Sequence, residues 1–279
     1  MKNNFIQRTI TGIIFVAVLI GGILGGPMSF SVLFAIITAL TIYEFGTIAG
    51  KQEGVRINRI ITALAGAFLF FGFAYIGVVP GHNEILIPYL FLIIYLTVSE
   101  LYLKRKNPLH NIAYTMMSQM YIALPFALLN VLAFHSSLTG SISEYNPILP
   151  LSIFIFTWIN DTGAYCSGML LGKHKLFERI SPKKSWEGSI GGGVFSIIAA
   201  IVMAHYFPFL SLGAWIGLGL TVVVFGTWGD LTESLLKRTL GIKDSGNILP
   251  GHGGMLDRFD STLMAVPASV VYLYLLSIL

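Results

Sequence analysis

TITGIIFVAVLIGGILGG, residues 9–26, is an apolar run that contains no charged residue. A helix needs about 20 largely apolar residues to cross the hydrocarbon core of a bilayer, so this run predicts a transmembrane span. Lys2 and Arg8 precede it, as basic residues precede the apolar core of a signal peptide, but no A-x-A cleavage signal follows. We therefore expect a first span that is retained.

The composition of the whole chain also indicates a membrane protein. Of its 279 residues, 55% are hydrophobic and only 11% are charged, whereas soluble domains are about 25% charged. The single cysteine, Cys166, excludes an intramolecular disulfide and a Cys-based zinc cluster. The predicted fold class is an all-α integral membrane protein, with one polytopic membrane domain over residues 1–279.

Eight further apolar runs of similar length follow the first, which predicts nine transmembrane helices. The expected spans are residues 9–26, 29–49, 60–79, 85–103, 112–134, 148–171, 189–207, 212–230 and 260–279.

The positions of the basic residues predict which side of the membrane each connection faces. All 17 Lys and Arg residues lie before the first span or in the connections after spans two, four, six and eight. Because cationic residues stay cytoplasmic, we expect a cytoplasmic N-terminus and a C-terminus outside. The connections after spans six and eight are the long cytoplasmic ones, so chemistry is expected there.

The last cytoplasmic connection ends in LPGHGGMLDRFDS, residues 249–261, which concentrates scarce charge. Asp257 and Asp260 are three residues apart, so a helix places them on one face, and a helix hairpin would bring Asp230 alongside. Carboxylate oxygens suit hard cations such as Mg²⁺, and carboxylates at membrane depth are functional candidates. We predict that these three aspartates bind one or two metal ions. Helix capping, or pairing with Arg258, is the structural alternative.

Glycines surround His252 in the same stretch. Glycine permits a positive φ and a close approach of backbone to ligand, and the amides of such a loop before a helix can bind an anion. We therefore expect Gly253 and Gly254 to contact phosphate, with a tight turn as the alternative. His252 is a candidate general base, a phosphate donor or a turn residue. Walker and Rossmann patterns are absent.

The two long connections also carry the basic residues that we expect to contact phosphate. Basic loops beside an acidic cluster are typical of a polyphosphate held by cations and metal together. Ordinary positive-inside charge, or contact with anionic lipid, is the alternative. These residues are Lys183, Lys184, Lys237, Arg238 and Lys243.

Three acidic residues lie within or at the ends of other spans. Asp161 forms a polar break with Asn160 and Thr162 inside the sixth span. A buried carboxylate there needs a partner, which we expect to be a substrate group or a basic residue of the following loop. Glu44 and Glu100 are interpreted as members of interhelical or interfacial pairs.

SLLKRTLGIKDSGNILPGHGGMLDRFD, residues 234–260, resembles the signature of the phosphatidate cytidylyltransferases, or CDP-diacylglycerol synthases. NDTGAYCSGMLLGK and SPKKSWEG are also similar to that family, although Ser185 stands where many members carry Thr, which keeps the hydroxyl. The resemblance covers about residues 158–261, within an expected catalytic region of residues 148–279. The fixed signature positions are Ser234, Lys237, Arg238, Lys243, Asp244, Gly246, Leu249, Pro250, His252, Gly253, Gly254, Asp257, Arg258 and Asp260.

The resemblance implies the reaction of CTP with phosphatidate to give CDP-diacylglycerol and pyrophosphate. It implies dependence on Mg²⁺, as one or two divalent ions with a monovalent ion left open, and a homodimer at the cytoplasmic leaflet. Membrane lipid is an expected partner and nucleic acid is not. The short loops, and the lack of an organelle targeting peptide, favour the plasma (inner) membrane of a bacterium.

The resemblance also implies roles for individual residues. The lipid phosphate would attack the α-phosphorus of CTP directly, so His252 is not required as a base. The expected catalytic residues are Asp230, Asp257, Asp260, Lys237, Arg238 and His252, with the three aspartates as metal ligands. The expected substrate-binding residues are Asp161, Ser181, Lys183, Lys184, Lys243, Asp244, Gly253, Gly254 and Arg258.

Two other functions fit parts of the pattern. A CTP-dependent lipid kinase would transfer the γ-phosphate to an alcohol, and it would release CDP instead of pyrophosphate. A transporter would also have many spans, but transporters often show repeated halves, and no internal repeat is visible here.

Overall fold

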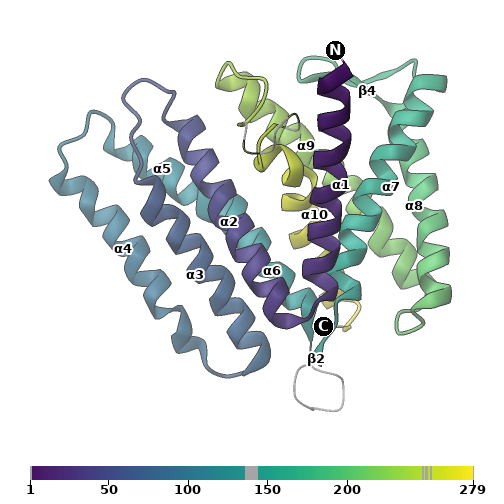
Figure 1. Cartoon of the computed structure of the whole chain (residues 1–279), viewed down its shortest axis with the longest axis horizontal. Coiled ribbons are helices and arrows are strands. Elements are labelled where there is room, and N and C mark those ends of the chain that lie inside the picture. The colour runs from purple at the N-terminus through teal and green to yellow at the C-terminus, as the bar shows by residue number, and fades with distance from the viewer. Residues whose placement is uncertain (1, 136–143, 247, 249–250, 252, 279) are drawn as a thin grey trace. The chain divides into compact units, whose positions relative to one another are not determined.

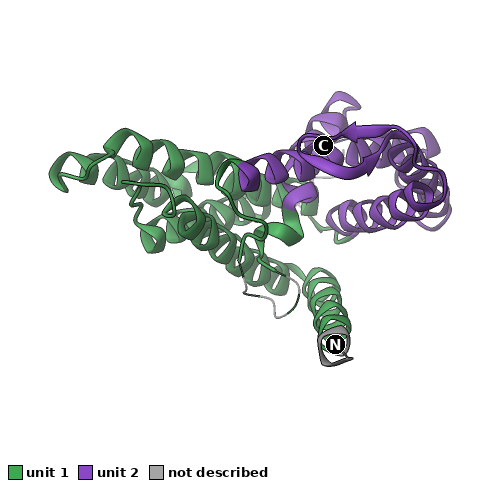
Figure 2. Ribbon diagram, turned by 90° about the horizontal axis from the view of Figure 1, so that it is seen from above, with its two compact units in different colours: residues 1–147, 239–259 green, residues 148–238, 260–279 purple. Residues whose placement is uncertain are grey.

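The protein was analysed as a computed structural model that describes residues 2–135, 144–246, 248, 251 and 253–278. Contacts between Cα atoms divide the chain into two compact units, which Figure 2 shows in different colours. Unit 1 comprises Met1–Pro147 and Thr239–Phe259, and unit 2 comprises Ile148–Arg238 and Asp260–Leu279. Unit 2 begins where we expected the catalytic region to begin, and the single domain over residues 1–279 stays a prediction.

Unit 1 contains the N-terminal helices and a short hairpin (Figure 1). A π turn joins α5 to α6 and ends two residues before Pro125, which has no N–H to donate to the preceding turn. The elements are α1 (Lys2–Leu24), α2 (Pro27–Ala49), α3 (Arg59–Val78), η1 (Asn83–Leu86), α4 (Ile87–Tyr102), α5 (Pro108–Ser118), η2 (Gln119–Ala123), α6 (Leu124–Ala133), β1 (Phe134–His135) and β2 (Glu144–Tyr145).

Aromatic side chains form the core of unit 1. The rings of Phe30 and Phe34 on α2 lie 5.0 Å apart, and Phe34 lies 6.3 Å from Phe70 on α3 and 6.4 Å from Phe126 on α6. All four side chains are buried. Such aromatic pairs contribute roughly 0.5–1.5 kcal/mol each beyond the burial of their area, so this cluster holds α2, α3 and α6 together.

Unit 2 contains the remaining helices and a second hairpin. Its strands pair antiparallel, with Lys175 opposite Ser185 and Phe177 opposite Ser181. Its elements are α7 (Ile148–Leu171), β3 (Lys175–Phe177), β4 (Ser181–Ser185), α8 (Trp186–Tyr206), α9 (Leu212–Thr239) and α10 (Leu256–Leu275), of which the last residue of α9 and the first turn of α10 belong to unit 1.

Small residues let α7 and α8 pack closely. A Cβ on Gly188 would lie 2.9 Å from the carbonyl oxygen of Ala164, and a Cβ on Gly192 would lie 2.3 Å from Oδ1 of Asn160. These two glycines are four residues apart on one face of α8. This spacing of small residues is common where membrane helices pack against each other.

The described residues include seven helices that are long and apolar enough to cross a membrane. They coincide with predicted spans one to five, seven and eight, and they support a multi-pass membrane protein. Predicted spans six and nine correspond to α7 and α10, which are helical but carry the polar residues Asn160, Asp161, Asp257, Arg258 and Asp260. The count of nine spans and the orientation of the termini stay predictions.

Candidate active site

Helices α9 and α10 approach each other closely at Gly229. A Cβ on Gly229 would lie 2.5 Å from the carbonyl oxygen of Asp260 and 3.1 Å from the Cα of Ser261, so only glycine fits there. Asp230 is the next residue on α9, and its carboxylate interacts electrostatically with that of Asp260. The hairpin therefore brings together two of the three aspartates that were predicted as metal ligands.

Asp230 is also paired with a lysine of the hairpin that precedes α8. Nζ of Lys184 lies 2.5 Å from Oδ2 of Asp230, and the two side chains are only 27% and 29% exposed. Ser234, one turn along α9, donates a hydrogen bond of 3.2 Å from Oγ to Oδ1 of Asp230. Both carboxylate oxygens of Asp230 therefore have a donor, and Lys184 supplies positive charge beside two carboxylates.

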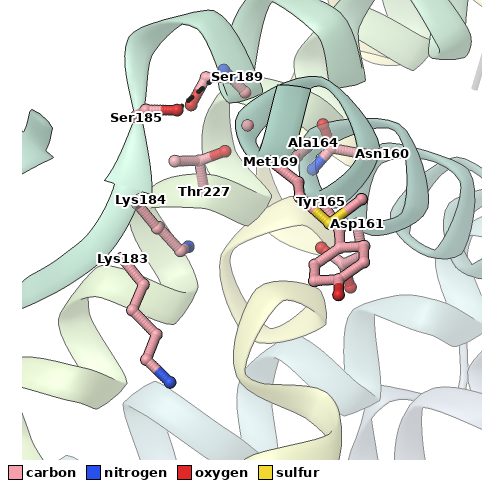
Figure 3. Close-up of a pocket in the computed structure, with 12 residues that line it drawn as sticks. Asn160, Asp161, Ala164, Tyr165, Met169, Lys183, Lys184, Ser185, Ser189 and Thr227 are labelled. Carbon is pink, nitrogen blue, oxygen red and sulfur yellow. Dashed lines mark hydrogen bonds between the residues drawn. The ribbon is translucent and has the colours of Figure 1, made fainter. Parts of the chain in front are cut away.

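A cavity of about 360 Å³ lies beside this ion pair in unit 2. Figure 3 shows Lys183 and Lys184 on one side of it and Asp161, Tyr165 and Met169 on the other. The volume is within the range of small-molecule sites, roughly 300–1,000 Å³. The lining is cationic on one side and partly apolar on the other, so it suits a ligand that has both an anionic group and an apolar part.

Asn160 lines the cavity, but its unsatisfied acceptor is buried against Gly192 of α8. Its side chain is 7% exposed, and Oδ1 has no hydrogen-bond partner among the described residues. A buried acceptor without a partner costs roughly 1–3 kcal/mol, and here this cost accompanies the close packing of α7 on Gly192 of α8. Asp161, expected as a buried carboxylate, is instead exposed, because α7 turns it out of the helix packing and towards the cavity. The expectation that Asp161 is buried was therefore wrong, and the identity of its expected partner stays a prediction.

The hairpin that carries the lysines is fixed at the start of α8. Oγ of Ser185 accepts a hydrogen bond of 3.1 Å from the N–H of Gly188 and so caps the helix. The carboxylate of Glu187 accepts hydrogen bonds from the N–H groups of Lys173 and His174 and lies 2.6 Å from Nδ1 of His174. Ser185 and Glu187 were not among the predicted site residues. The sequence signal that could have identified Ser185 is a serine directly before an expected helix, which is typical of an N-cap.

The remaining predicted residues of unit 2 lie on the same hairpin or on the last turns of α9. Ser181 is half-buried in β4. Lys237 forms an ion pair of 2.6 Å with Glu233, whose side chain is fully buried, and Arg238 is exposed. The pairing of Lys237 with a residue one turn earlier was not predicted.

In unit 1, Asp257 organises the start of α10. Its Oδ2 accepts hydrogen bonds of 2.9 Å from the N–H groups of both Ser245 and Gly254. Gly253 has a φ of 84°, and a Cβ there would lie 2.7 Å from the same oxygen. Asp257 thus accepts hydrogen bonds from backbone amides near the start of α10, which was the structural alternative to binding a metal ion. The amide of Gly254, expected to contact phosphate, donates to Asp257 instead and would have to change partner to bind an anion.

The other predicted residues of this segment lie at the surface. Lys243, Asp244 and Arg258 are exposed. His252 lies outside the described residues. Glu44, expected in a pair between helices or at the interface, instead accepts hydrogen bonds from the backbone at the start of α10.

The described residues contain no group of three or more His, Cys, Asp or Glu side chains placed to hold a metal ion. Mg²⁺ usually takes only one or two carboxylates from a protein, together with substrate phosphates and water. Asp230 and Asp260 fit that demand, because both residues are half-buried and their carboxylates interact electrostatically. The donor set is therefore compatible with Mg²⁺.

Comparisons with known proteins agree with one another. Residues 6–276 match the profile described as the Cytidylyltransferase family. Proteins named phosphatidate cytidylyltransferase from Staphylococcus haemolyticus (strain JCSC1435) and Staphylococcus aureus (strain COL) are 52% and 50% identical to the chain over 119 residues. Each alignment covers 42% of this chain and 45% of the relative, so the matched part spans about half the length of those proteins. Because the family profile covers nearly the whole chain, the protein belongs to the cytidylyltransferase family.

Proposed function

We propose that the protein is a phosphatidate cytidylyltransferase, which transfers CMP from CTP to phosphatidate and releases pyrophosphate. Membership of the family, and the name of relatives that are 50–52% identical over the matched part, support this activity. The observation that carries the proposal is the cavity of unit 2, where Lys183 and Lys184 lie opposite a partly apolar wall. An amphiphilic substrate with a phosphate head is the ligand that such a lining suits.

The proposed reaction is a direct displacement. A phosphate oxygen of phosphatidate forms a bond to the α-phosphorus of CTP, and the bond from that phosphorus to the bridging oxygen of the β-phosphate breaks. The electron pair leaves with pyrophosphate. A phosphatidate phosphate is already mostly ionised near neutral pH, so no side chain needs to remove a proton. Catalysis is then chiefly alignment and neutralisation of two anions.

The cationic side chains would do most of that neutralisation. Lys183 and Lys184 would bind the phosphate of phosphatidate, with Ser181 on the same strand, and Asp161 would contact the substrate from the opposite side of the cavity. The aliphatic side chain of Met169 and the ring of Tyr165 would contact the apolar part of the lipid. The residues proposed to bind CTP are Lys237, Arg238, Lys243, Asp244, Gly253, Gly254 and Arg258, and His252 stays a candidate donor.

Asp230, Asp257 and Asp260 are proposed to hold Mg²⁺, as one or two divalent ions, with a monovalent ion left open. Asp257 is included because it lies three residues before Asp260 in α10. Bound Mg²⁺ would supply positive charge to the phosphate oxygens of the substrates. Lys184 forms an ion pair of 2.5 Å with Asp230. When Asp230 binds the metal ion, the ammonium group of Lys184 would become available to the lipid phosphate.

We further propose nine spans, a cytoplasmic N-terminus and an external C-terminus. The support is that all 17 Lys and Arg residues lie before the first span or in the connections after spans two, four, six and eight, which face the same side as the N-terminus. The active site would then face the cytoplasm of a bacterial cell, at the plasma membrane, in a homodimer that has no nucleic-acid partner. The organisms of the relatives agree with a bacterial membrane.

Labelled CTP tests the reaction and separates it from its nearest alternative. Purified protein in detergent is supplied with phosphatidate, Mg²⁺ and CTP labelled at the α-phosphate. Label should move into the lipid phase, and no lipid label should appear when the γ-phosphate is labelled instead. Lipid label from γ-labelled CTP would establish a kinase. Absence of lipid label from both forms of CTP, in a folded sample, would contradict the proposal.

A further inference from the structure

Glu44 on α2 is a buried carboxylate that lies in unit 1. Its side chain is 4% exposed, and none of the ion pairs formed by the described residues includes it. A buried carboxylate without compensation is strongly unfavourable. Its charge must therefore be compensated by hydrogen bonds, and the identity of the donors indicates its role.

All of the described donors to Glu44 come from one segment far along the chain. Oε2 accepts a hydrogen bond of 2.9 Å from the N–H of Met255, and Oε1 accepts one of 3.2 Å from the N–H of Leu256. The hydroxyl of Ser245 also donates to Oε1. We call residues 244–255 the glycine loop, of which 247, 249, 250 and 252 lie outside the described residues. Glu44 thus binds both ends of this loop.

Two glycines make the approach to Glu44 sterically feasible. A Cβ on Gly246 would lie 2.6 Å from Oε2, and a Cβ on Gly254 would lie under 2 Å from Oε1. Both φ angles are outside the left-handed region, so space rather than backbone strain demands glycine at these positions. Gly246 and Gly254 therefore leave room for the carboxylate of Glu44 against the loop backbone.

Two residues of the loop contact both Glu44 and Asp257, so Glu44 can influence the position of Asp257 indirectly. Ser245 donates its hydroxyl to Glu44 and its N–H to Asp257, and Gly254 packs on Glu44 while donating its N–H to Asp257. A shift of the loop away from Glu44 would move both amide donors of Asp257. The orientation of Asp257 thus depends on Glu44 through two residues.

We propose that Glu44 is a positioning residue, which fixes the glycine loop and through it the carboxylate of Asp257. The proposal rests on the proposed function, in which Asp257 and the loop serve CTP. It requires a group that only accepts hydrogen bonds, because three donors converge on Glu44. A glutamine would turn its NH₂ group towards one of them.

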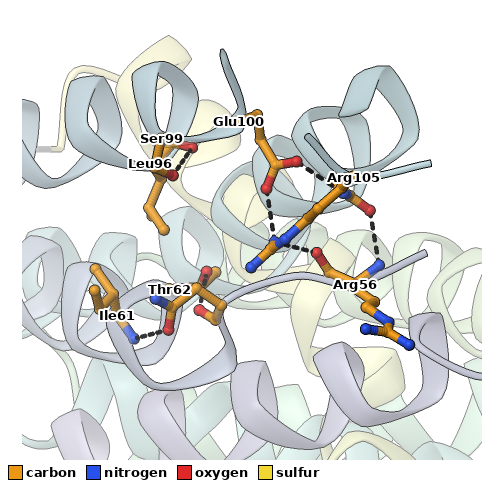
Figure 4. A network of polar contacts seen from close by, with 9 residues as sticks. Arg56, Ile61, Thr62, Leu96, Ser99, Glu100 and Arg105 are labelled. Carbon is orange, nitrogen blue, oxygen red and sulfur yellow. Dashed lines mark hydrogen bonds and ion pairs between the residues drawn. The ribbon is translucent and has the colours of Figure 1, made fainter. Parts of the chain in front are cut away.

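Glu100 on α4 provides a matched control. It is also a buried glutamate of unit 1, and it accepts hydrogen bonds of 2.7 Å from Arg105 and 2.8 Å from Asn111. Figure 4 shows that Arg105 also reaches the backbone of Arg56, so this network joins α4 to the segment before α3. None of its described partners belongs to the glycine loop.

The test compares full-length Glu44→Gln, Glu44→Asp and Glu100→Gln proteins in detergent. Steady-state kinetics should show that Glu44→Gln lowers kcat/KM for CTP by about 10²-fold, because small displacements of catalytic groups have effects of that size. Glu44→Asp keeps the acceptors and should recover part of the loss. Hydrogen exchange at the amides of Met255 and Leu256 should accelerate in Glu44→Gln and stay as in the unsubstituted protein in Glu100→Gln.

The outcomes separate this proposal from the proposed function. If the unsubstituted protein makes no CDP-lipid, the function fails, and exchange alone then decides whether Glu44 fixes the loop. Equal kcat/KM for CTP in Glu44→Gln and Glu100→Gln, with an active unsubstituted protein, would overturn the positioning role. If Glu44→Gln does not fold, Gly246→Ala tests the same contact, since its Cβ would press on Oε2. It should give the same loss, and unchanged kinetics would overturn the proposal.

Discussion

Nζ of Lys184 lies 2.5 Å from Oδ2 of Asp230, and this ion pair connects the hairpin before α8 to α9 within unit 2. The side chains are less than one third exposed, so the pair is screened less than a surface pair would be. Asp260 also interacts with both residues. Lys184 thus interacts with two carboxylates and also lines the cavity, where a phosphate would compete with Asp230 for the lysine ammonium group.

Replacing Lys184 by Met should lower kcat/KM for phosphatidate by about 10²-fold, as loss of one preorganised donor to a reacting phosphate usually does. Lys184→Arg should retain more activity because it keeps the charge. Steady-state kinetics with mixed micelles of phosphatidate provide the measurement. Lys51→Met is the control, because Lys51 is an exposed lysine of unit 1. Equal losses in the Lys184→Met and Lys51→Met variants would show that only surface charge matters.

Gly229→Ala should destabilise the contact between α9 and α10. The new Cβ would meet the carbonyl oxygen of Asp260 at 2.5 Å, and overpacking of this kind costs typically 1–3 kcal/mol. Activity should fall as well, since Asp230 and Asp260 would be separated. Gly213→Ala is the control on the same helix, because a Cβ there meets no atom within 4 Å. Denaturant unfolding in detergent and the transfer assay should agree, and a Gly229→Ala protein as stable and active as Gly213→Ala would refute the close contact.

Loss of the Ser185 cap should affect both stability and activity. Ser185→Ala removes the acceptor for the N–H of Gly188 and should lower the free energy of unfolding by about 1 kcal/mol. Activity should also fall, because Lys184 is the adjacent residue, whereas Ser185→Thr should retain both.

Ser211→Ala removes a comparable cap at the start of α9, where Oγ accepts from the N–H of Ala214 at 3.2 Å. This control should lose similar stability while keeping kcat. If the two alanine variants lose activity equally, the effect of Ser185 comes from stability alone.

Cysteine labelling in cells should reveal the orientation of the spans. In a Cys166→Ala background, His82→Cys should react with a membrane-impermeant maleimide in intact cells, since His82 lies in a connection that has no Lys or Arg. Lys51→Cys should react only after permeabilisation. The reverse pattern would show that the predicted orientation is inverted.

The apolar runs predicted the helices well, because length and hydrophobicity alone decide whether a segment can span a bilayer. Helix boundaries were less accurate. The last helix was expected from residue 260 and begins at Leu256, because Asp257 accepts from two loop amides and supports an earlier start. The π turn before Pro125 was not anticipated either, since it depends on how α5 and α6 pack.

The role of Glu44 could not be predicted from local sequence. Its donors are 201 to 212 residues away along the chain, and no periodicity links such positions. The proximity of Asp230 and Asp260 was easier to predict, because a hairpin of two consecutive helices brings the end of the first helix near the start of the second. Local patterns thus predicted the acidic pair, whereas contacts between distant segments required the structure.

The most direct test of the central claim is ³¹P NMR of the products formed by the purified, unsubstituted protein with CTP, phosphatidate and Mg²⁺. Pyrophosphate and CDP-diacylglycerol should appear in equal amounts as CTP and phosphatidate disappear, and EDTA should stop both. Formation of CDP without pyrophosphate, or no consumption of phosphatidate by a folded sample, would contradict CMP transfer.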